Sequence, residues 1–82
     1  MKERKVKTHS VKLNVKYYDL VSSRIKNFEV RLNDRDYRVG DWLEMHEWTG
    51  TEYTGRWLTR RIEYMLPLGE FGLKDWVVMA IE

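Results

Sequence analysis

The stretch from Lys26 to Trp48 constrains the fold most, because it holds two runs in which apolar and polar residues alternate. The first run consists of Phe28, Val30 and Leu32, with Glu29 and Arg31 between them. A period of two is typical of a half-buried strand. We therefore expect the three apolar side chains to face the core and the two charged side chains to share the opposite face.

A polar segment separates this run from the second one. Residues 33–36, Asn-Asp-Arg-Asp, are polar, and the short side chains of Asn and Asp bond to their own backbone and favour a turn. Gly40 can then take a positive φ without steric cost before Leu43 and Met45 resume the inward alternation. The sequence thus predicts two strands flanking a charged loop.

A third alternating run opens the chain. Val11, Leu13 and Val15 alternate with polar residues from His9 onward, which predicts a strand with His9 facing inward and Lys12 outward. Asn14 can cap a short helix that ends near Ser22 or Ser23. Its expected apolar side, at spacings of three and four, consists of Tyr17 or Tyr18, Leu20, Val21 and Ile25.

The C-terminal half is expected to hold two more strands. Residues 48–54 form the expected hairpin loop, and a long strand follows from Gly55 to Pro67 with apolar residues on both faces. Such a strand has halves that face different neighbours, as in a sheet that curls. A helical turn around residues 71–74 and a central strand from Trp76 to Ile81 complete a mainly β (α+β) domain of about five strands.

Length and composition allow one domain. The 82 residues are 43% hydrophobic, and none is cysteine, so there is no disulfide scaffold and no thiolate metal site. No apolar run approaches the ~18 residues of a membrane span, and no signal-peptide pattern is present. We expect a soluble, cytoplasmic monomer without a membrane partner.

Positive charge is concentrated near the N-terminus. Residues 1–16 contain six basic residues and one acidic residue, Glu3. We expect a flexible basic arm over residues 1–8 and one domain over residues 9–82, with phosphate contacts from Lys5, Lys7 and Lys12. The alternative is a solvated, frayed terminus without a ligand.

The string FEVRLNDRDYRVGD resembles a small phage and bacterial family of unknown function, and so do His9, residues 53–56 (YTGR) and the segments near Gly72 and Val77. That family belongs to the ASCH group of the PUA-like superfamily. The resemblance implies a small β-barrel with a cleft beside the first helix, in a superfamily that mostly binds RNA or modified nucleotides. Relatives have a proline near Val15 and a glycine near Arg24. A left-handed Arg24 would cost roughly 1 kcal/mol, so either the cap is strained or its geometry differs.

Four charged residues are expected to line that cleft, namely Lys26, Glu29, Arg31 and Arg35. Relatives with amidohydrolase activity on an acylated cytidine have a catalytic lysine at the position of Lys26, and a partly desolvated lysine can act as a base. Those enzymes have threonine in place of Glu29, and their catalytic glutamate lies in a helical insertion that this chain lacks. Glu70 could substitute for it. The structural alternative is that Glu29 pairs with Arg31 or Arg35 only to fix strand register.

Aromatic residues near arginine suggest base stacking. Tyr37, Tyr53 and Arg56 lie in or beside polar loops and are the candidates for ligand contact. We expect the rings of Trp42, Trp57, Tyr64 and Trp76 to belong to the core. His9 and His46 lack a spaced carboxylate partner, and neither a nucleophile motif nor a phosphate loop is present, so no metal and no cofactor are predicted.

The sequence therefore predicts an RNA- or modified-nucleoside-binding domain. A nucleoside amidohydrolase or a nuclease is the enzymatic alternative, and whether the chain is an enzyme stays open. A phage-type protein-interaction module is the third hypothesis. The first two need a concave polar pocket at Lys26 and Glu29, whereas the third needs an exposed apolar patch.

Overall fold

The computed structural model describes residues 4–82, which form a five-stranded sheet with one α-helix. The first three residues of the predicted arm lie outside this range. In chain order the elements are β1 (Thr8–Asn14), α1 (Val15–Ser22), β2 (Phe28–Leu32), β3 (Trp42–Trp48), β4 (Tyr53–Pro67), the 3-10 turn η1 (Gly69–Phe71) and β5 (Trp76–Ile81). The predicted helical turn thus begins two residues earlier than expected.

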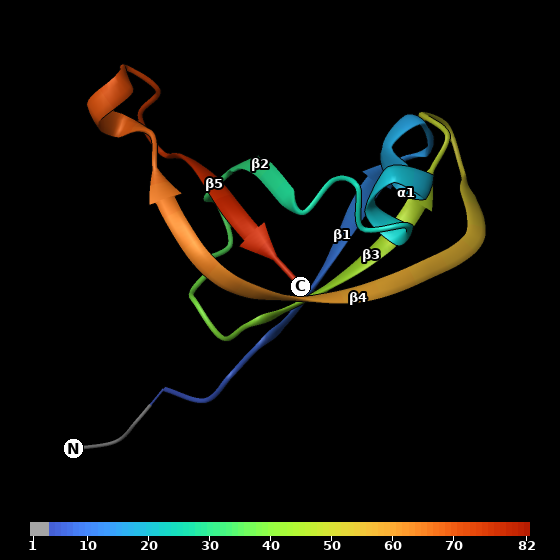
Figure 1. The fold of residues 1–82 in the computed structure, drawn as a ribbon, viewed down its shortest axis with the longest axis horizontal. Coiled ribbons are helices and arrows are strands. Elements are labelled where there is room, and N and C mark those ends of the chain that lie inside the picture. Colours follow the sequence, from blue (N-terminus) through green and yellow to red (C-terminus); the bar gives the residue numbers. More distant parts are fainter. Residues whose placement is uncertain (1–3) are drawn as a thin grey trace.

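The long strand β4 joins the two halves of the sheet. Its first half, up to Arg61, pairs with β3 and its second half, from Ile62, pairs with β5, and the register shifts just after this change of partner, between Ile62 and Tyr64. The expectation that its halves face different neighbours is confirmed. The strand order is β1-β3-β4-β5-β2, with β1 parallel to β3 and every other pair antiparallel. The sheet bends over itself (Figure 1), but no ladder joins β1 to β2, so it is not closed into a barrel.

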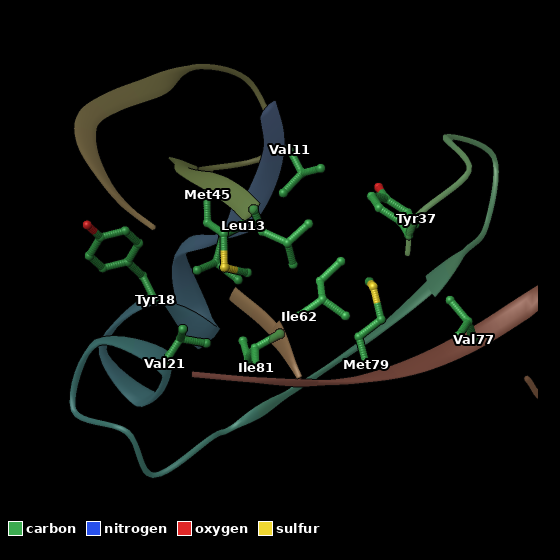
Figure 2. Packing of buried hydrophobic residues seen from close by; sticks show 11 residues of the cluster. Val11, Leu13, Tyr18, Val21, Tyr37, Met45, Ile62, Val77, Met79 and Ile81 are labelled. Carbon is green, nitrogen blue, oxygen red and sulfur yellow. The ribbon is translucent and has the colours of Figure 1, made fainter. Parts of the chain in front are cut away.

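The core lies between the two halves of the bent sheet. Figure 2 shows its side chains between β1 and β3 on one side and β5 on the other. The buried hydrophobic residues are Val11, Leu13, Tyr18, Val21, Tyr37, Leu43, Met45, Ile62, Val77, Met79 and Ile81. The inward parity predicted for His9, Leu43 and Met45 is confirmed.

The predicted parity of β2 is wrong. Glu29 is only 5% exposed, whereas Phe28, Val30 and Leu32 are 43–47% exposed. The three apolar side chains share the outer face of the sheet with their β5 partners Ala80, Val78 and Trp76. Because β2 is an edge strand, its inner face lies between the core residues Val77 and Met79 of β5 and the gap toward β1, so a hydrogen-bonded cluster of charges can occupy that face.

The helix begins and ends close to the predicted residues. The Asn14 side chain accepts a hydrogen bond from the Lys16 N–H at 3.0 Å, which caps the first turn. After Ser23 the chain reverses through Arg24, whose φ of 66° is left-handed. The strained form of the cap is therefore the one adopted. Tyr18 and Val21 are buried, whereas Leu20 and Ile25, predicted to be apolar contacts, are exposed.

The expected division of the aromatic rings is wrong. Trp42, Trp57, Tyr64 and Trp76, predicted to be core, are all more than a third exposed. Tyr37, predicted to be a loop residue open to ligand, is 3% exposed and packs edge-on against His9, with ring centroids 4.8 Å apart. The reason is that outward strand positions hold most of the large rings, while the loop carrying Tyr37 folds inward over the core.

Candidate functional site

A hollow of about 520 Å³ lies where the free edges of β1 and β2 approach each other beside α1. Its wall is formed by Lys12, Leu13, Asn14, Tyr17, Lys26, Phe28, Glu29, Val30 and Arg31. This volume is in the range typical of small-molecule sites. Three of the predicted cleft residues, Lys26, Glu29 and Arg31, are therefore brought together in one concave place.

The Glu29 carboxylate is the centre of this cluster. Lys26 Nζ donates to Oε1 at 2.9 Å, and Arg31 Nε donates to Oε2 at 2.9 Å. Lys26 Nζ also donates to the carbonyl oxygen of Phe28 at 2.7 Å. A nearly buried carboxylate is thus held between two cations, which compensates for its loss of hydration.

Guanidinium groups bridge the gap that no strand pairing closes. Arg31 Nη2 donates to the carbonyl oxygen of Lys12, and Arg35 Nη1 donates to that of Ser10. Both carbonyl groups belong to the free edge of β1, where ladder donors are missing. The Arg35 side chain is therefore held against β1 beside the hollow and does not form part of its wall.

Two aromatic rings stand over the Lys26 ammonium group. Nζ lies 4.7 Å from the ring centroid of Phe28 and 5.2 Å from that of Tyr17. Both rings are partly exposed and line the hollow. The site therefore offers π-faces beside a cation and a carboxylate, a combination suited to a flat, polar heterocycle.

Other predicted site residues lie elsewhere. Arg56 is paired with the buried Glu47, with Nε and Nη2 donating at 2.9 and 2.6 Å. These hydrogen bonds, and to a smaller extent one from Thr54, hold the pKa of Glu47 below its usual range. Glu70 is carried by η1, at the opposite end of the molecule from α1 (Figure 1), and does not line the hollow.

The predicted phosphate contacts divide between the arm and the rim of the hollow. Lys12 lines the hollow, whereas Lys5 is exposed in the segment before β1. The Lys7 N–H donates to Asp41 Oδ1 at 3.1 Å, and Arg4 donates to the same carboxylate at 2.9 and 3.1 Å. The arm is thus fastened to the domain from Arg4 onward.

Asp41 is fully buried and collects these donors with a further partner, His9 Nε2, at 2.8 Å. Burial alone would raise the pKa of Asp41. The hydrogen bonds from Arg4, His9 and the backbone N–H groups of Lys7 and Arg38 outweigh it and hold the pKa well below the usual range. Asp41 is therefore an anionic anchor for the arm.

Residues 8–81 match the profile of a domain of unknown function, DUF3850. The chain belongs to the DUF3850 family. It is also 42% identical over 73 residues to the "Uncharacterized 12.9 kDa protein in GpA 3'region" of Escherichia phage P2. That alignment covers 89% of this chain and 66% of the phage protein, so the domain spans slightly less than two thirds of its relative's length.

In this DUF3850 domain, sequence reasoning missed Asn14, Tyr17 and Phe28 as lining residues. The sequence pattern indicates Tyr17 and Phe28 only as apolar positions of a helix and a strand. One missed ion pair did leave a signal, because Glu47 has the same inward parity as Leu43 and Met45 and a buried acid there requires a partner. Within residues 4–82 there is no cluster of His, Asp and Glu suited to a metal ion, and no helix is long and apolar enough to span a membrane.

Proposed function

We propose that this domain binds RNA or a modified nucleoside in the hollow between β1 and β2, as an ASCH-type relative of the PUA-like domains. The observation that supports this most is the cluster of Lys26, Glu29 and Arg31 beside two exposed rings in one concavity. The open side of the bent sheet would correspond to the cleft of a PUA-like barrel.

Some hydrogen-bond donors in the hollow are free to bind a ligand. An ammonium group has three N–H donors, and Lys26 uses two of them on Phe28 and Glu29. The Nη1 group of Arg31 makes no hydrogen bond within residues 4–82. These free donors suit the carbonyl oxygens of a base or the oxygens of a phosphate, and the rings of Tyr17 and Phe28 suit its flat face.

Stability alone is a weak reason for this cluster. Ion pairs of this kind contribute about 0–1 kcal/mol when open to water, and burying the charges costs hydration free energy. An apolar edge strand would be simpler to stabilise. A ligand that accepts hydrogen bonds from the remaining donors would account for these charges, whereas packing alone does not.

The test is the double variant Glu29→Gln, Arg31→Gln, which removes both charges and keeps a polar side chain at each position. Its matched control is Glu70→Gln, Lys74→Gln, which also removes one acid and one base but lies outside the hollow. Nucleosides and short RNAs are titrated while amide shifts are recorded. We expect the first variant to fold and lose binding and the control to bind like the parent. Normal binding by the first variant would refute the proposal.

The exposed apolar face of β2 and β5 favours a second candidate, a protein-interaction module. Phe28, Val30, Leu32 and Trp76 lie together on this face, and β2 is a free edge. An exposed apolar face of this kind can pack against the same face of a second copy around a two-fold axis. Sedimentation velocity checks this candidate: it requires a dimer that Val30→Thr, Leu32→Thr converts to a monomer, and a parent that is already monomeric would rule such pairing out.

A further inference from the structure

The outer face of β1, β3 and β4 carries a group of aromatic side chains that the hollow does not use. His46 and Trp57 are cross-strand partners and stack with ring centroids 5.7 Å apart and planes 23° apart. The ring of Tyr53 packs edge-on against two neighbours. Its centroid lies 6.0 Å from that of His46 and 4.8 Å from that of Trp48. We call these four residues the aromatic face.

The aromatic face is open to solvent. Trp57 and Tyr53 are each 55% exposed, and His46 and Trp48 are half-buried. A shallow depression of about 230 Å³ lies beside them, lined by Ser10, His46 and Tyr53. Large rings at outward strand positions contribute little to the packing of the core, so they are available for contact with another molecule.

The charge of this surface favours an anionic chain. Among the outward positions of β1, β3 and the first half of β4, the basic residues are Lys12 and Arg61 and the acidic one is Glu44. The Glu44 carboxylate forms a hydrogen bond with His46 Nε2 at 2.7 Å. Lys12 Nζ lies 4.0 Å from the ring centroid of Trp48, at the edge of the aromatic face.

Lys12 also connects the aromatic face to the hollow, whose wall it forms on the β1 side. A chain leaving the hollow over Lys12 would therefore reach Trp48, His46 and Trp57 next. We propose that the aromatic face is a stacking site for the nucleotides that flank the one in the hollow, so that the ligand is single-stranded RNA and not a free nucleoside. This assignment rests on the proposed function and names its substrate class.

A single strand fits better than a duplex for a geometric reason. Stacking on Trp57 or Tyr53 requires the face of a base, and in a duplex those faces are covered by neighbouring bases. Arrays of exposed rings with nearby lysine or arginine are the usual surface for single strands. Lys12 would then contact a phosphate between two stacked nucleotides.

The test compares two probes on the same variants: uridine 5′-monophosphate and an oligouridylate long enough to cross β1, β3 and β4. Trp57→Leu removes a ring of the aromatic face that is 55% exposed, together with its stacking on His46. Tyr64→Leu is the matched control, because Tyr64 is 61% exposed on the other half of β4, away from the aromatic face. Binding is followed by amide shifts for the mononucleotide and by fluorescence anisotropy for the labelled oligonucleotide.

We expect Trp57→Leu to weaken oligouridylate binding about tenfold, the effect of one lost base stack, and to leave the mononucleotide affinity unchanged. Tyr64→Leu should change neither affinity. Equal oligouridylate affinity of Trp57→Leu and parent, equal losses for both probes, or no measurable binding of the oligonucleotide to the parent would each overturn the proposal. Equal affinity for the deoxy oligonucleotide would overturn the assignment to RNA.

The two proposals fail separately. If Glu29→Gln, Arg31→Gln abolishes mononucleotide binding but Trp57→Leu changes nothing, only the aromatic face is refuted. If the double variant binds both probes normally while Trp57→Leu loses the oligonucleotide, the proposal for the hollow is refuted, and the aromatic face binds single strands without a nucleotide held in the hollow.

Discussion

Replacing Arg24 with glycine should stabilise the domain. Arg24 has a φ of 66° at the turn between α1 and β2. The left-handed conformation costs a residue with a Cβ atom about 1–2 kcal/mol, whereas glycine adopts it freely. Glycine loses about 0.5–1 kcal/mol more backbone entropy on folding, so the expected net gain is a few tenths to about 1 kcal/mol.

A second effect acts in the same direction. Burial lowers the pKa of Arg60, and the nearby positive charge of Arg24 lowers it further because like charges repel. Arg60 donates to the carbonyl oxygen of Val21 at 3.1 Å, next to the end of the helix. Removing the Arg24 side chain would relieve this repulsion as well as the backbone strain.

Thermal and urea unfolding of parent, Arg24→Gly and Arg24→Ala separate the two contributions. Alanine removes the charge but keeps the Cβ atom, so backbone strain predicts that only glycine raises the melting temperature appreciably. One kcal/mol corresponds to roughly 4–8 °C for a domain of this size. An equal gain in both variants would assign the effect to charge, and a loss in Arg24→Gly would refute the reasoning on the left-handed turn.

Burial, buried charge and the basic arm can each be tested separately. Leu43→Ala should lower the free energy of unfolding in urea by about 2–5 kcal/mol, because Leu43 is fully buried, whereas Leu32→Ala on the outer face should lower it by less than about 1 kcal/mol. Similar losses in both variants would contradict the observed parity of β2. Because the pKa of Asp41 is lower in the folded state than in the unfolded state, its stabilisation is complete above pH ~4 and is lost as the pH falls below that value. Urea unfolding from pH 7 to pH 3 should therefore show a smaller acid loss for Asp41→Asn than for the parent, and identical pH profiles would disprove this role. The variant Lys5→Gln, Lys7→Gln should fold normally and make RNA binding less dependent on salt. The slope of log K against log salt concentration should fall by about 0.7 for each phosphate that these lysines neutralise in the parent. An unchanged slope would exclude phosphate contacts by these lysines.

The sequence was sufficient for the elements but not for every face. Alternation located β1, β2 and β3, apolar runs bounded by turn residues located β4 and β5, and Asn14 marked the start of the helix, because these signals are local. For β2 the same alternation predicted the wrong inner face. Whether an edge strand turns its apolar residues to the core depends on what lies across the gap, and β1 arrives there only through tertiary folding.

The candidate site shows the same limit. Lys26, Glu29 and Arg31 could be grouped in advance because they are close in the sequence. Tyr37 was misplaced because polar neighbours suggested an exposed loop, although its ring is held against His9 from a distant strand. Proximity along the chain is visible in the sequence, whereas packing between segments 28 residues apart is not.

The arginine bridges across the open side of the sheet also bear on whether the edge of β1 can pair with another strand. An uncovered strand edge is a template on which other molecules can polymerise through backbone pairing. By occupying the carbonyl groups of Ser10 and Lys12, Arg35 and Arg31 place cationic groups along that edge of β1. The same side chains that border the hollow thus cover this strand edge, and a substitution that removes them would leave the carbonyl groups of Ser10 and Lys12 open to pairing with another strand.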